Sequence, residues 1–312
     1  MVVTNSPGRG SARDNFAGLH FIDDLFNHNE EHINMTLAKK RPAFVQSPRP
    51  MALITGASSG IGEALSWCFA RDGYDVVLVA RNPAKLHVLA DDIAKECPID
   101  AVVEPADLAK TGEAQRLAAA LRLRRKKQGV DVVVNNAGVL YQGEFLQVTA
   151  LEHQQMIALN CAGLTAMIAA FVPAMVKRGH GRVLNVASIA SFQPVPVIST
   201  YAATKAFVLS LTESLSEELK GSGVTMTALC PGVTDTNMLA GAQRSNARLS
   251  KIPSFMIGDV DDVARQGYNA CLRGDVICVP GVVNRAAMLA SRSAPKWLVR
   301  RLGGVLGRSA AA

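Results

Sequence analysis

Long apolar runs are missing from this sequence, although 49% of its 312 residues are hydrophobic. We find no run of about 18 uncharged apolar residues, the length that a membrane-spanning helix needs, and therefore predict no membrane span. Cysteine motifs are missing as well, because the six cysteines form no CxxC pair and have no histidines at ligand spacing. We expect no metal site, and we expect the cysteines to be buried small side chains of a cytoplasmic protein, where thiols stay reduced.

Acidic residues are missing from position 276 onward. The same stretch holds six basic residues: Arg285, Arg292, Lys296, Arg300, Arg301 and Arg308. The net charge of +7 would suit a nucleic-acid-binding protein, but the sequence carries no helix-turn-helix, zinc or aromatic stacking pattern. We therefore predict no nucleic-acid partner.

Residues 1–50 differ in composition from the rest of the chain. Stretches rich in Pro, Gly and Ser flank a segment, "HFIDDLFNHNEEHINMTLAKK", that has the length of one short helix. We expect no secretory signal, since no apolar run precedes a small-residue cleavage site, and no organelle transit peptide, since the segment is acidic. Two interpretations stay open for this extension: a flexible arm, or a docking segment for a partner.

Short apolar runs alternate with helical stretches from about residue 51 to residue 280. The runs cover residues 52–55, 75–80, 101–105, 131–136, 182–188, 224–230 and 276–280. Nearly continuous apolar strands that alternate with helices are typical of a parallel sheet covered on both faces. We therefore predict an α/β fold over residues 51–280, a three-layer, doubly wound domain of about seven parallel strands, followed by a C-terminal extension over residues 281–312.

A glycine-rich turn, "TGASSGIG", follows the first predicted strand and leads into a helix. Glycines at such a turn let the backbone approach a pyrophosphate closely, and the helix N-terminus favours its negative charge. The spacing is GxxxGxG rather than GxGxxG, so a tight turn without a ligand stays an alternative. The predicted dinucleotide contacts are Gly56, Ser58, Ser59, Gly60, Ile61 and Gly62.

The second predicted strand ends in Ala80, and Arg81 follows it. Proteins that prefer NAD generally place an acidic residue here to bind the adenine ribose hydroxyls. A guanidinium in that place matches a 2′-phosphate, so we predict NADP(H) as the cofactor and NAD(H) as the less favoured one. A solvated surface arginine is the alternative.

Further candidate cofactor contacts lie where later strands end, which is where ligands bind in open α/β sheets. "PADL" follows the third strand, "NNAG" ends the fourth and "CPGVTDT" ends the sixth. In the first of these turns a carboxylate can accept a hydrogen bond from the adenine amino group, and in the last the threonine hydroxyls can reach the nicotinamide. The residues predicted from these turns are Asp107, Leu108, Asn136, Ala137, Gly138, Pro231, Gly232, Thr234 and Thr236.

One pair of side chains has the spacing of an acid–base catalyst. Tyr201 and Lys205 are four residues apart in a predicted helix, so they share a face. A protonated Lys205 is expected to favour the phenolate and to lower the pKa of Tyr201 from about 10 towards the working range. Ser188 stands thirteen residues upstream of Tyr201 at a strand end, where its hydroxyl can hold a carbonyl oxygen.

In these motifs the chain resembles the compact branch of the short-chain dehydrogenase/reductase family. The resemblance covers about residues 51–280 and rests on TGASSGIG, NNAG, Asn160, Ser188, the Tyr201/Lys205 pair and PGVTDT, which occur in the family's order. It implies a Rossmann-type parallel sheet, an NAD(P)(H) cofactor, no metal, and reversible hydride transfer between a carbonyl and a secondary alcohol.

The resemblance also implies roles for four residues. Tyr201 is the general acid for reduction, and Ser188 orients the substrate oxygen. Lys205 lowers the pKa of the tyrosine and binds the nicotinamide ribose, and Asn160 holds a water in the proton relay. Members of the family commonly pair through the helix that carries the tyrosine, so a homodimer or homotetramer is expected.

The C-terminal extension resembles that of an NADP-preferring subgroup known as DltE-like. Its apolar residues alternate with arginines as in an amphipathic helix: Trp297, Leu298, Leu302, Val305 and Leu306. Such a helix can cover the substrate cleft or a subunit contact. Peripheral binding to an anionic membrane surface is the alternative.

The substrate is expected to be a small molecule, an apolar carbonyl or alcohol. Six residues of the loops after Ser188 and after the Pro-Gly turn would form a mainly apolar pocket, or else part of the core: Phe192, Val195, Val197, Met238, Phe255 and Met256. The alternative function is a non-catalytic NADP(H)-sensing or scaffold protein on the same fold. An epimerase or dehydratase is a further alternative, but the TGxxGxxG turn usual in those relatives is missing.

Overall fold

The computed structural model describes residues 49–124, 129–235 and 257–293, which all belong to the unit Gln46–Ala312. The predictions made for residues 1–48, for the loop that holds Thr236, Met238, Phe255 and Met256, and for the tail beyond residue 293 lie outside the described residues.

A parallel sheet of seven strands forms the centre of this unit, in the order β3-β2-β1-β4-β5-β6-β7. Every strand but the shortest is four to six residues long, and all of these except the edge strand β3 are largely buried, as expected for strands that helices cover on both faces. This confirms the predicted doubly wound fold. The strands are β1 (Met51–Thr55), β2 (Asp75–Ala80), β3 (Ala101–Pro105), β4 (Val132–Asn135), β5 (Gly181–Val186), β6 (Val224–Leu229) and β7 (Ile277–Cys278).

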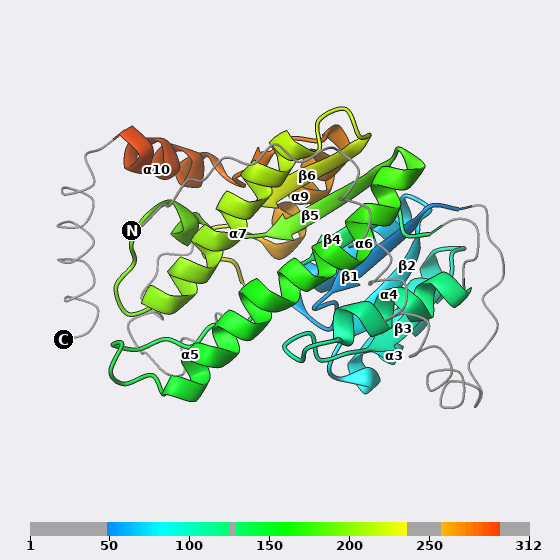
Figure 1. Cartoon of the computed structure of the whole chain (residues 1–312), viewed down its shortest axis with the longest axis horizontal. Helices are drawn as coiled ribbons and strands as arrows, with labels where there is room; N and C mark the ends of the chain where they lie inside the picture. Colours follow the sequence, from blue (N-terminus) through cyan, green and yellow to red (C-terminus); the bar gives the residue numbers. More distant parts are fainter. Residues whose placement is uncertain (1–48, 125–128, 236–256, 294–312) are drawn as a thin grey trace, which may run out of the picture. The chain divides into compact units, whose positions relative to one another are not determined.

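Helices cover both faces of the sheet. On one face, α2 (Gly60–Arg71), α3 (Pro83–Glu96) and α9 (Val260–Arg273) share a buried apolar cluster with the strands. On the other face, seen from the front in Figure 1, lie α4 (Glu113–Arg124), α6 (Leu164–Arg178) and α7 (Ser199–Glu218). The remaining elements are α5 (Ala150–Ile157), the π-helical η2 (Ala158–Gly163), the 3₁₀ turn η3 (Ile189–Phe192) and α10 (Val282–Ser293).

The strand order reverses between β1 and β4, which are neighbours in the sheet although two helix–strand units separate them in the chain. Thr55, the last residue of β1, ties the two strand ends together. Its hydroxyl accepts hydrogen bonds from the backbone N–H groups of Asn136 (2.9 Å) and Ala137 (3.0 Å). A reversal of this kind opens a crevice at the carboxyl ends of the strands, where ligands of doubly wound proteins bind.

One helical stretch, Ala150–Arg178, is long and apolar enough to span a membrane by length and composition alone. The sequence criterion misses it because polar residues such as Asn160 and Thr165 interrupt the apolar run. In this fold the stretch packs on the sheet, and Met167, Phe171 and Met175 are buried in the core. Core helices of this kind meet the same criterion.

Candidate active site

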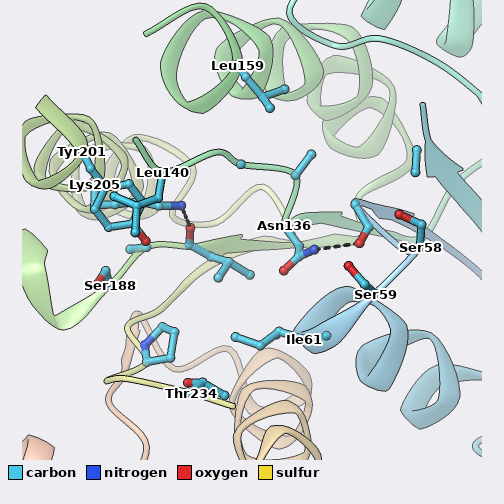
Figure 2. A pocket seen from close by; sticks show the side chains of 18 of the residues that line it. Ser58, Ser59, Ile61, Asn136, Leu140, Leu159, Ser188, Tyr201, Lys205 and Thr234 are labelled. Carbon is cyan, nitrogen blue, oxygen red and sulfur yellow. Dashed lines mark hydrogen bonds between the residues drawn. The ribbon is translucent and has the colours of Figure 1, made fainter. Parts of the chain in front are cut away.

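A cavity of about 970 Å³ runs along the carboxyl ends of the strands. Most of the residues predicted as site residues line it, and Figure 2 shows several of them pointing into it. They are Gly56, Ser58, Ser59, Gly60, Ile61, Arg81, Asp107, Leu108, Asn136, Ala137, Gly138, Ser188, Tyr201, Lys205, Pro231, Gly232 and Thr234. Gly62 and Asn160 do not line it, and Thr236 lies outside the described residues.

The glycine-rich turn forms a cradle that side chains would fill. Gly56 has a φ of +66°, and a Cβ there would lie 2.7 Å from Asn136 Nδ2. A Cβ at Gly62 would lie 2.3 Å from the carbonyl oxygen of Gly56. Asn136 holds the turn in place, since its Nδ2 donates to the carbonyl oxygens of Thr55 (3.0 Å) and Gly56 (3.2 Å, Figure 2).

The N-terminus of α2 opens into this cradle. Ser59, the N-cap residue, has extended backbone and makes no side-chain cap bond within the part of the chain that the structure describes. The first N–H groups of a helix have no partner inside the helix, and they carry the positive end of its dipole. The cradle therefore fits a pyrophosphate group, which needs close backbone approach and N–H donors.

The end of the cavity that Arg81 lines, which we call the outer end, carries cationic groups and a second helix N-terminus. Arg81, Asn82 and Lys85 all line it. Asn82 caps α3, because its side chain accepts from the backbone N–H groups of Ala84 (3.0 Å) and Lys85 (3.3 Å). The sequence prediction did not include Lys85, although a second basic residue four places after Arg81, one helical turn on, was a signal for it.

The Tyr201/Lys205 pair lies on α7 and faces the end of β5, where Ser188 follows the strand (Figure 2). Lys205 is 5% exposed, and its Nζ donates a 2.7 Å hydrogen bond to the carbonyl oxygen of Val186. The same Nζ lies 5.7 Å from the centroid of the Tyr201 ring. The Ser188 side chain lies close enough to the phenol of Tyr201 to lower its pKa. The fold thus brings three groups, separated in the sequence, to one point of the cavity.

The protonation of the pair differs from the expectation that Lys205 lowers the pKa of Tyr201. Burial raises the pKa of Tyr201 to about 12, and the Ser188 hydroxyl opposes this rise. Burial also lowers the pKa of Lys205 to about 8, because an ammonium loses solvation in the interior. The protein's own groups therefore hold Tyr201 as a neutral phenol at pH 7, ready to donate a proton.

Asn160 is 1% exposed and stands in the π-helical turn between α5 and α6. Its Oδ1 accepts from the backbone N–H of Val139 (2.9 Å), and its Nδ2 donates to the carbonyl oxygen of Val139 (3.0 Å) and to Thr204 Oγ1 (3.1 Å). A Cβ at Gly138 would lie 3.3 Å from Asn160 Oδ1 and 3.5 Å from Lys205 Nζ. Gly138 thus leaves room beside both polar atoms, although Asn160 does not line the cavity.

The end of the cavity where Ser188 and Tyr201 lie is the inner end, and the rest of its lining is mainly apolar. Of the residues predicted for a substrate pocket, Val195 lines the cavity, whereas Phe192 and Val197 do not. Residues that the sequence analysis missed also line the cavity: Leu140, Gln142, Leu159, Ile189, Gln193 and Ile198. Their positions depend on how two loops fold back over the sheet, for which the sequence carries no local signal.

The described part of the C-terminal extension also lies at this end. Helix α10 packs on η3, and the side-chain amide of Asn284 leaves no space for a Cβ on Gly232, which would lie 2.6 Å from it. Arg285 anchors the helix, because its Nε donates to the carbonyl oxygen of Val279 (2.8 Å). The first turns of α10 therefore support the Pro231–Thr234 side of the cavity.

The family model for short chain dehydrogenases matches residues 50–247. The chain belongs to the short-chain dehydrogenase family. Among curated members, an uncharacterized oxidoreductase of Staphylococcus aureus (strain MRSA252) is 34% identical over 193 residues, which are 61% of this chain and 80% of the relative. The family resemblance stated from the motifs is thereby confirmed.

Solved structures of short-chain dehydrogenases share the fold. A short-chain dehydrogenase from Sphingobium yanoikuyae in complex with NADPH is 33% identical, with a TM-score of 0.68 over 78% of this chain and 93% of that one. The bulky-bulky ketone specific alcohol dehydrogenase from Comamonas testosteroni is 28% identical, with a TM-score of 0.65 over 80% of this chain and 96% of that one. As a member of this family, the protein is an oxidoreductase with a Rossmann-type NAD(P)-binding fold.

Proposed function

We propose that the protein is an NADP(H)-dependent oxidoreductase that interconverts a carbonyl and a secondary alcohol, with Tyr201 as the general acid and base. The observation that carries the proposal is the convergence of the Tyr201 phenol, the Ser188 hydroxyl and the buried Lys205 ammonium on the cavity that also contains the glycine-rich cradle. A nucleotide in the cradle and a carbonyl at the inner end would then share one enclosed space.

The outer end of the cavity supports NADP(H) over NAD(H). Strand β2 ends at Ala80, so no carboxylate follows it to bind the ribose hydroxyls or repel a phosphate. Instead Arg81, Lys85 and the N-terminus of α3 supply positive charge to this end, and a 2′-phosphate is the group that such charge favours. The relative from Sphingobium yanoikuyae, solved with NADPH, is consistent with this choice.

The chain's own residues would hold the substrate oxygen and move the proton. NADPH, when bound in the cradle, supplies the hydride to the carbonyl carbon. Ser188 would donate a hydrogen bond to the carbonyl oxygen and keep it beside the Tyr201 phenol, which donates the proton. Because the pKa of Tyr201 is raised to about 12, the phenol is protonated at pH 7, which suits the reductive direction.

Lys205 and Asn160 would resupply the proton. The Lys205 Nζ is held by the Val186 carbonyl oxygen, and its pKa of about 8 lets it carry or release a proton near neutral pH. Asn160 Oδ1 and Lys205 Nζ both lie near the Cβ position of Gly138, where a water would bridge them. Neither side chain would contact the carbonyl group of the substrate itself.

The inner end favours a ketone with apolar substituents. Leu140, Val195 and Ile198 offer apolar surface, and besides the three catalytic side chains the polar groups come from Gln142 and Gln193. The relative from Comamonas testosteroni acts on bulky-bulky ketones. We include ketones with two large substituents among the candidate substrates of this chain.

Assembly and location are part of the proposal. A homodimer or homotetramer would cover apolar side chains that α5 and α7 expose, namely Leu151 (61%), Ile157 (51%) and Phe207 (43%). The six cysteines are all free thiols, which suits a reducing compartment such as the cytoplasm. Membership of the DltE-like subgroup, and peripheral membrane contact through the tail beyond residue 293, remain predictions.

The test follows the oxidation of NADPH and NADH with a panel of ketones and aldehydes, for wild type and Tyr201→Phe. We expect turnover with NADPH that is at least 100-fold slower in the variant, since general acid catalysis contributes about 10²–10⁴ in rate. A fluorescence titration with NADPH is the control, and the variant should bind it as wild type does. Tight NADPH binding without turnover of any carbonyl would favour the sensor alternative. Preference for NADH would contradict the assignment of Arg81.

A further inference from the structure

Two loops form the mouth of the cavity at its inner end. The loop after β4 contributes Leu140 and Gln142, and the loop before α7 contributes Gln193, Val195 and Ile198. Their relative position decides how much room a substrate has beside Tyr201.

A backbone bond and an unusual backbone conformation join these loops at one point. The N–H of Gly143 donates a 2.8 Å hydrogen bond to the carbonyl oxygen of Val197. Val197 has a φ of +62°, the one positive value among the non-glycine residues that the structure describes. A β-branched side chain disfavours this conformation, and residues kept in it are usually fixed by their surroundings. The loop before α7 therefore depends on contacts with its neighbours.

His153 on α5 joins the first of these loops to the start of α7 at a second point. Its Nε2 lies 3.2 Å from the carbonyl oxygen of Phe145, and its Nδ1 lies 2.8 Å from Thr200 Oγ1. A carbonyl oxygen only accepts hydrogen bonds, so Nε2 must carry the proton. In a neutral ring Nδ1 is then an acceptor, and the hydroxyl of Thr200 donates to it.

Stacking strengthens this second link. The rings of Phe145 and His153 are stacked, with centroids 4.5 Å apart and planes 25° apart. Phe145 is 60% exposed, so burial in the core does not account for its position. The three residues Phe145, His153 and Thr200, which we call the clasp, thus hold the tip of the first loop to the residue that precedes Tyr201.

We propose that the clasp is a specificity-determining device in which His153 and Thr200 are positioning residues that set the width of the cavity mouth. The inference rests on the proposed function, because the mouth is the place where a carbonyl substrate would enter. An intact clasp keeps Leu140 and Gln142 close to Ile198 and so keeps the substrate beside the phenol. Without it the loop after β4 opens, and large ketones lose contacts that small ketones never make.

The first test measures amide hydrogen exchange of the full-length protein with NADPH bound. Thr200→Val removes the hydroxyl at nearly constant shape, whereas Thr200→Ser keeps it. Ser214→Ala is a matched control, since the Ser214 hydroxyl bonds only within the outer face of α7, to the carbonyl oxygen of Ser210 (2.9 Å). We expect exchange of residues 140–148 to become about five-fold faster in Thr200→Val, the effect of losing about one hydrogen bond, and to stay at the wild-type rate in Thr200→Ser and Ser214→Ala. Equal rates in all four proteins would overturn the clasp.

The second test measures kcat and KM for cyclohexanone and for benzophenone with saturating NADPH. In Thr200→Val we expect the KM for benzophenone to rise about five-fold, with the KM for cyclohexanone and both kcat values within about two-fold of wild type. His153→Asn, which retains a polar atom near Nδ1, and His153→Gln, which retains one near Nε2, should each fall between wild type and His153→Ala. Equal losses for both ketones would overturn the role in specificity. Wild-type protein that reduces neither ketone nor any other carbonyl would overturn the proposed function, and the exchange rates would still decide whether the clasp exists.

Discussion

Lys205 should make the protein less stable at pH 7, because the pKa of this buried ammonium falls from its ordinary value of 10.5 to about 8. At about 1.4 kcal/mol for each pKa unit, burying the charged form costs about 3 kcal/mol of folding free energy. Lys205→Met removes this cost, but it also removes the hydrogen bond to the Val186 carbonyl oxygen, which contributes about 1 kcal/mol. We therefore expect Lys205→Met to be more stable than wild type by about 2 kcal/mol at pH 7 and to be inactive.

The direction of the pH dependence follows from where each state holds the proton. The native protein holds the Lys205 proton only up to about pH 8, and the unfolded chain holds it up to about pH 10.5. Between these values the unfolded state binds more protons, so the stability of wild type rises with pH relative to that of the variant. The advantage of Lys205→Met should accordingly be full below pH 8 and disappear near pH 9.5. By about pH 10.5 it should reverse to a deficit of about 1 kcal/mol, which is the lost hydrogen bond.

Urea unfolding of both proteins, followed by circular dichroism at pH 7 and pH 10, measures this difference. A difference of about 2 kcal/mol corresponds to a shift of about 4–8 °C in Tm, so thermal unfolding is an independent check. A variant that is less stable than wild type at pH 7, or a difference that does not change with pH, would refute the reasoning.

Three further substitutions test separate parts of the site. Gly62→Ala should weaken NADPH binding at least 100-fold in a fluorescence titration, because a Cβ would lie 2.3 Å from the Gly56 carbonyl oxygen and distort the cradle. Unchanged affinity would show that the cradle does not hold the nucleotide. Arg81→Gln and Lys85→Gln should each raise the Kd for NADPH about ten-fold and leave the Kd for NADH within about two-fold of wild type, as expected if both side chains bind the 2′-phosphate. Equal losses of affinity for the two nucleotides would contradict this assignment. Ser188→Ala should lower kcat about 100-fold with the Kd for NADPH unchanged, since it removes a donor to the substrate oxygen. A change in KM alone would show that Ser188 binds the substrate without stabilising the transition state.

The features that could be predicted from the sequence are those that short motifs specify. The alternation of strands and helices along the chain, the cradle and the three converging side chains each depend on local patterns, such as the glycines of TGASSGIG and the four-residue spacing of Tyr201 and Lys205. In a doubly wound sheet the carboxyl ends of the strands meet at one edge, so motifs at strand ends are brought together by the topology alone.

The features that escaped prediction depend on the packing of distant segments. Leu140 and Gln142 line the cavity because the loop after β4 folds back and bonds to Val197, more than fifty residues away in the sequence. Phe192 and Val197 carry the expected apolar character but do not line the cavity. The raised pKa of Tyr201 in the structure without cofactor was not foreseen, because a helical spacing says nothing about burial, and burial dominates there.

The central claim is hydride transfer between a nicotinamide and a carbonyl with Tyr201 as the proton donor. The most direct measurement supplies NADPH labelled with deuterium at the transferring C4 position, incubates it with a ketone from the panel, and analyses the alcohol by mass spectrometry. We expect one deuterium on the carbinol carbon with wild type, and at least 100-fold less labelled alcohol with Tyr201→Phe at equal NADPH occupancy. Labelled alcohol formed at the same rate by the variant, or no labelled alcohol from any ketone despite bound NADPH, would contradict it.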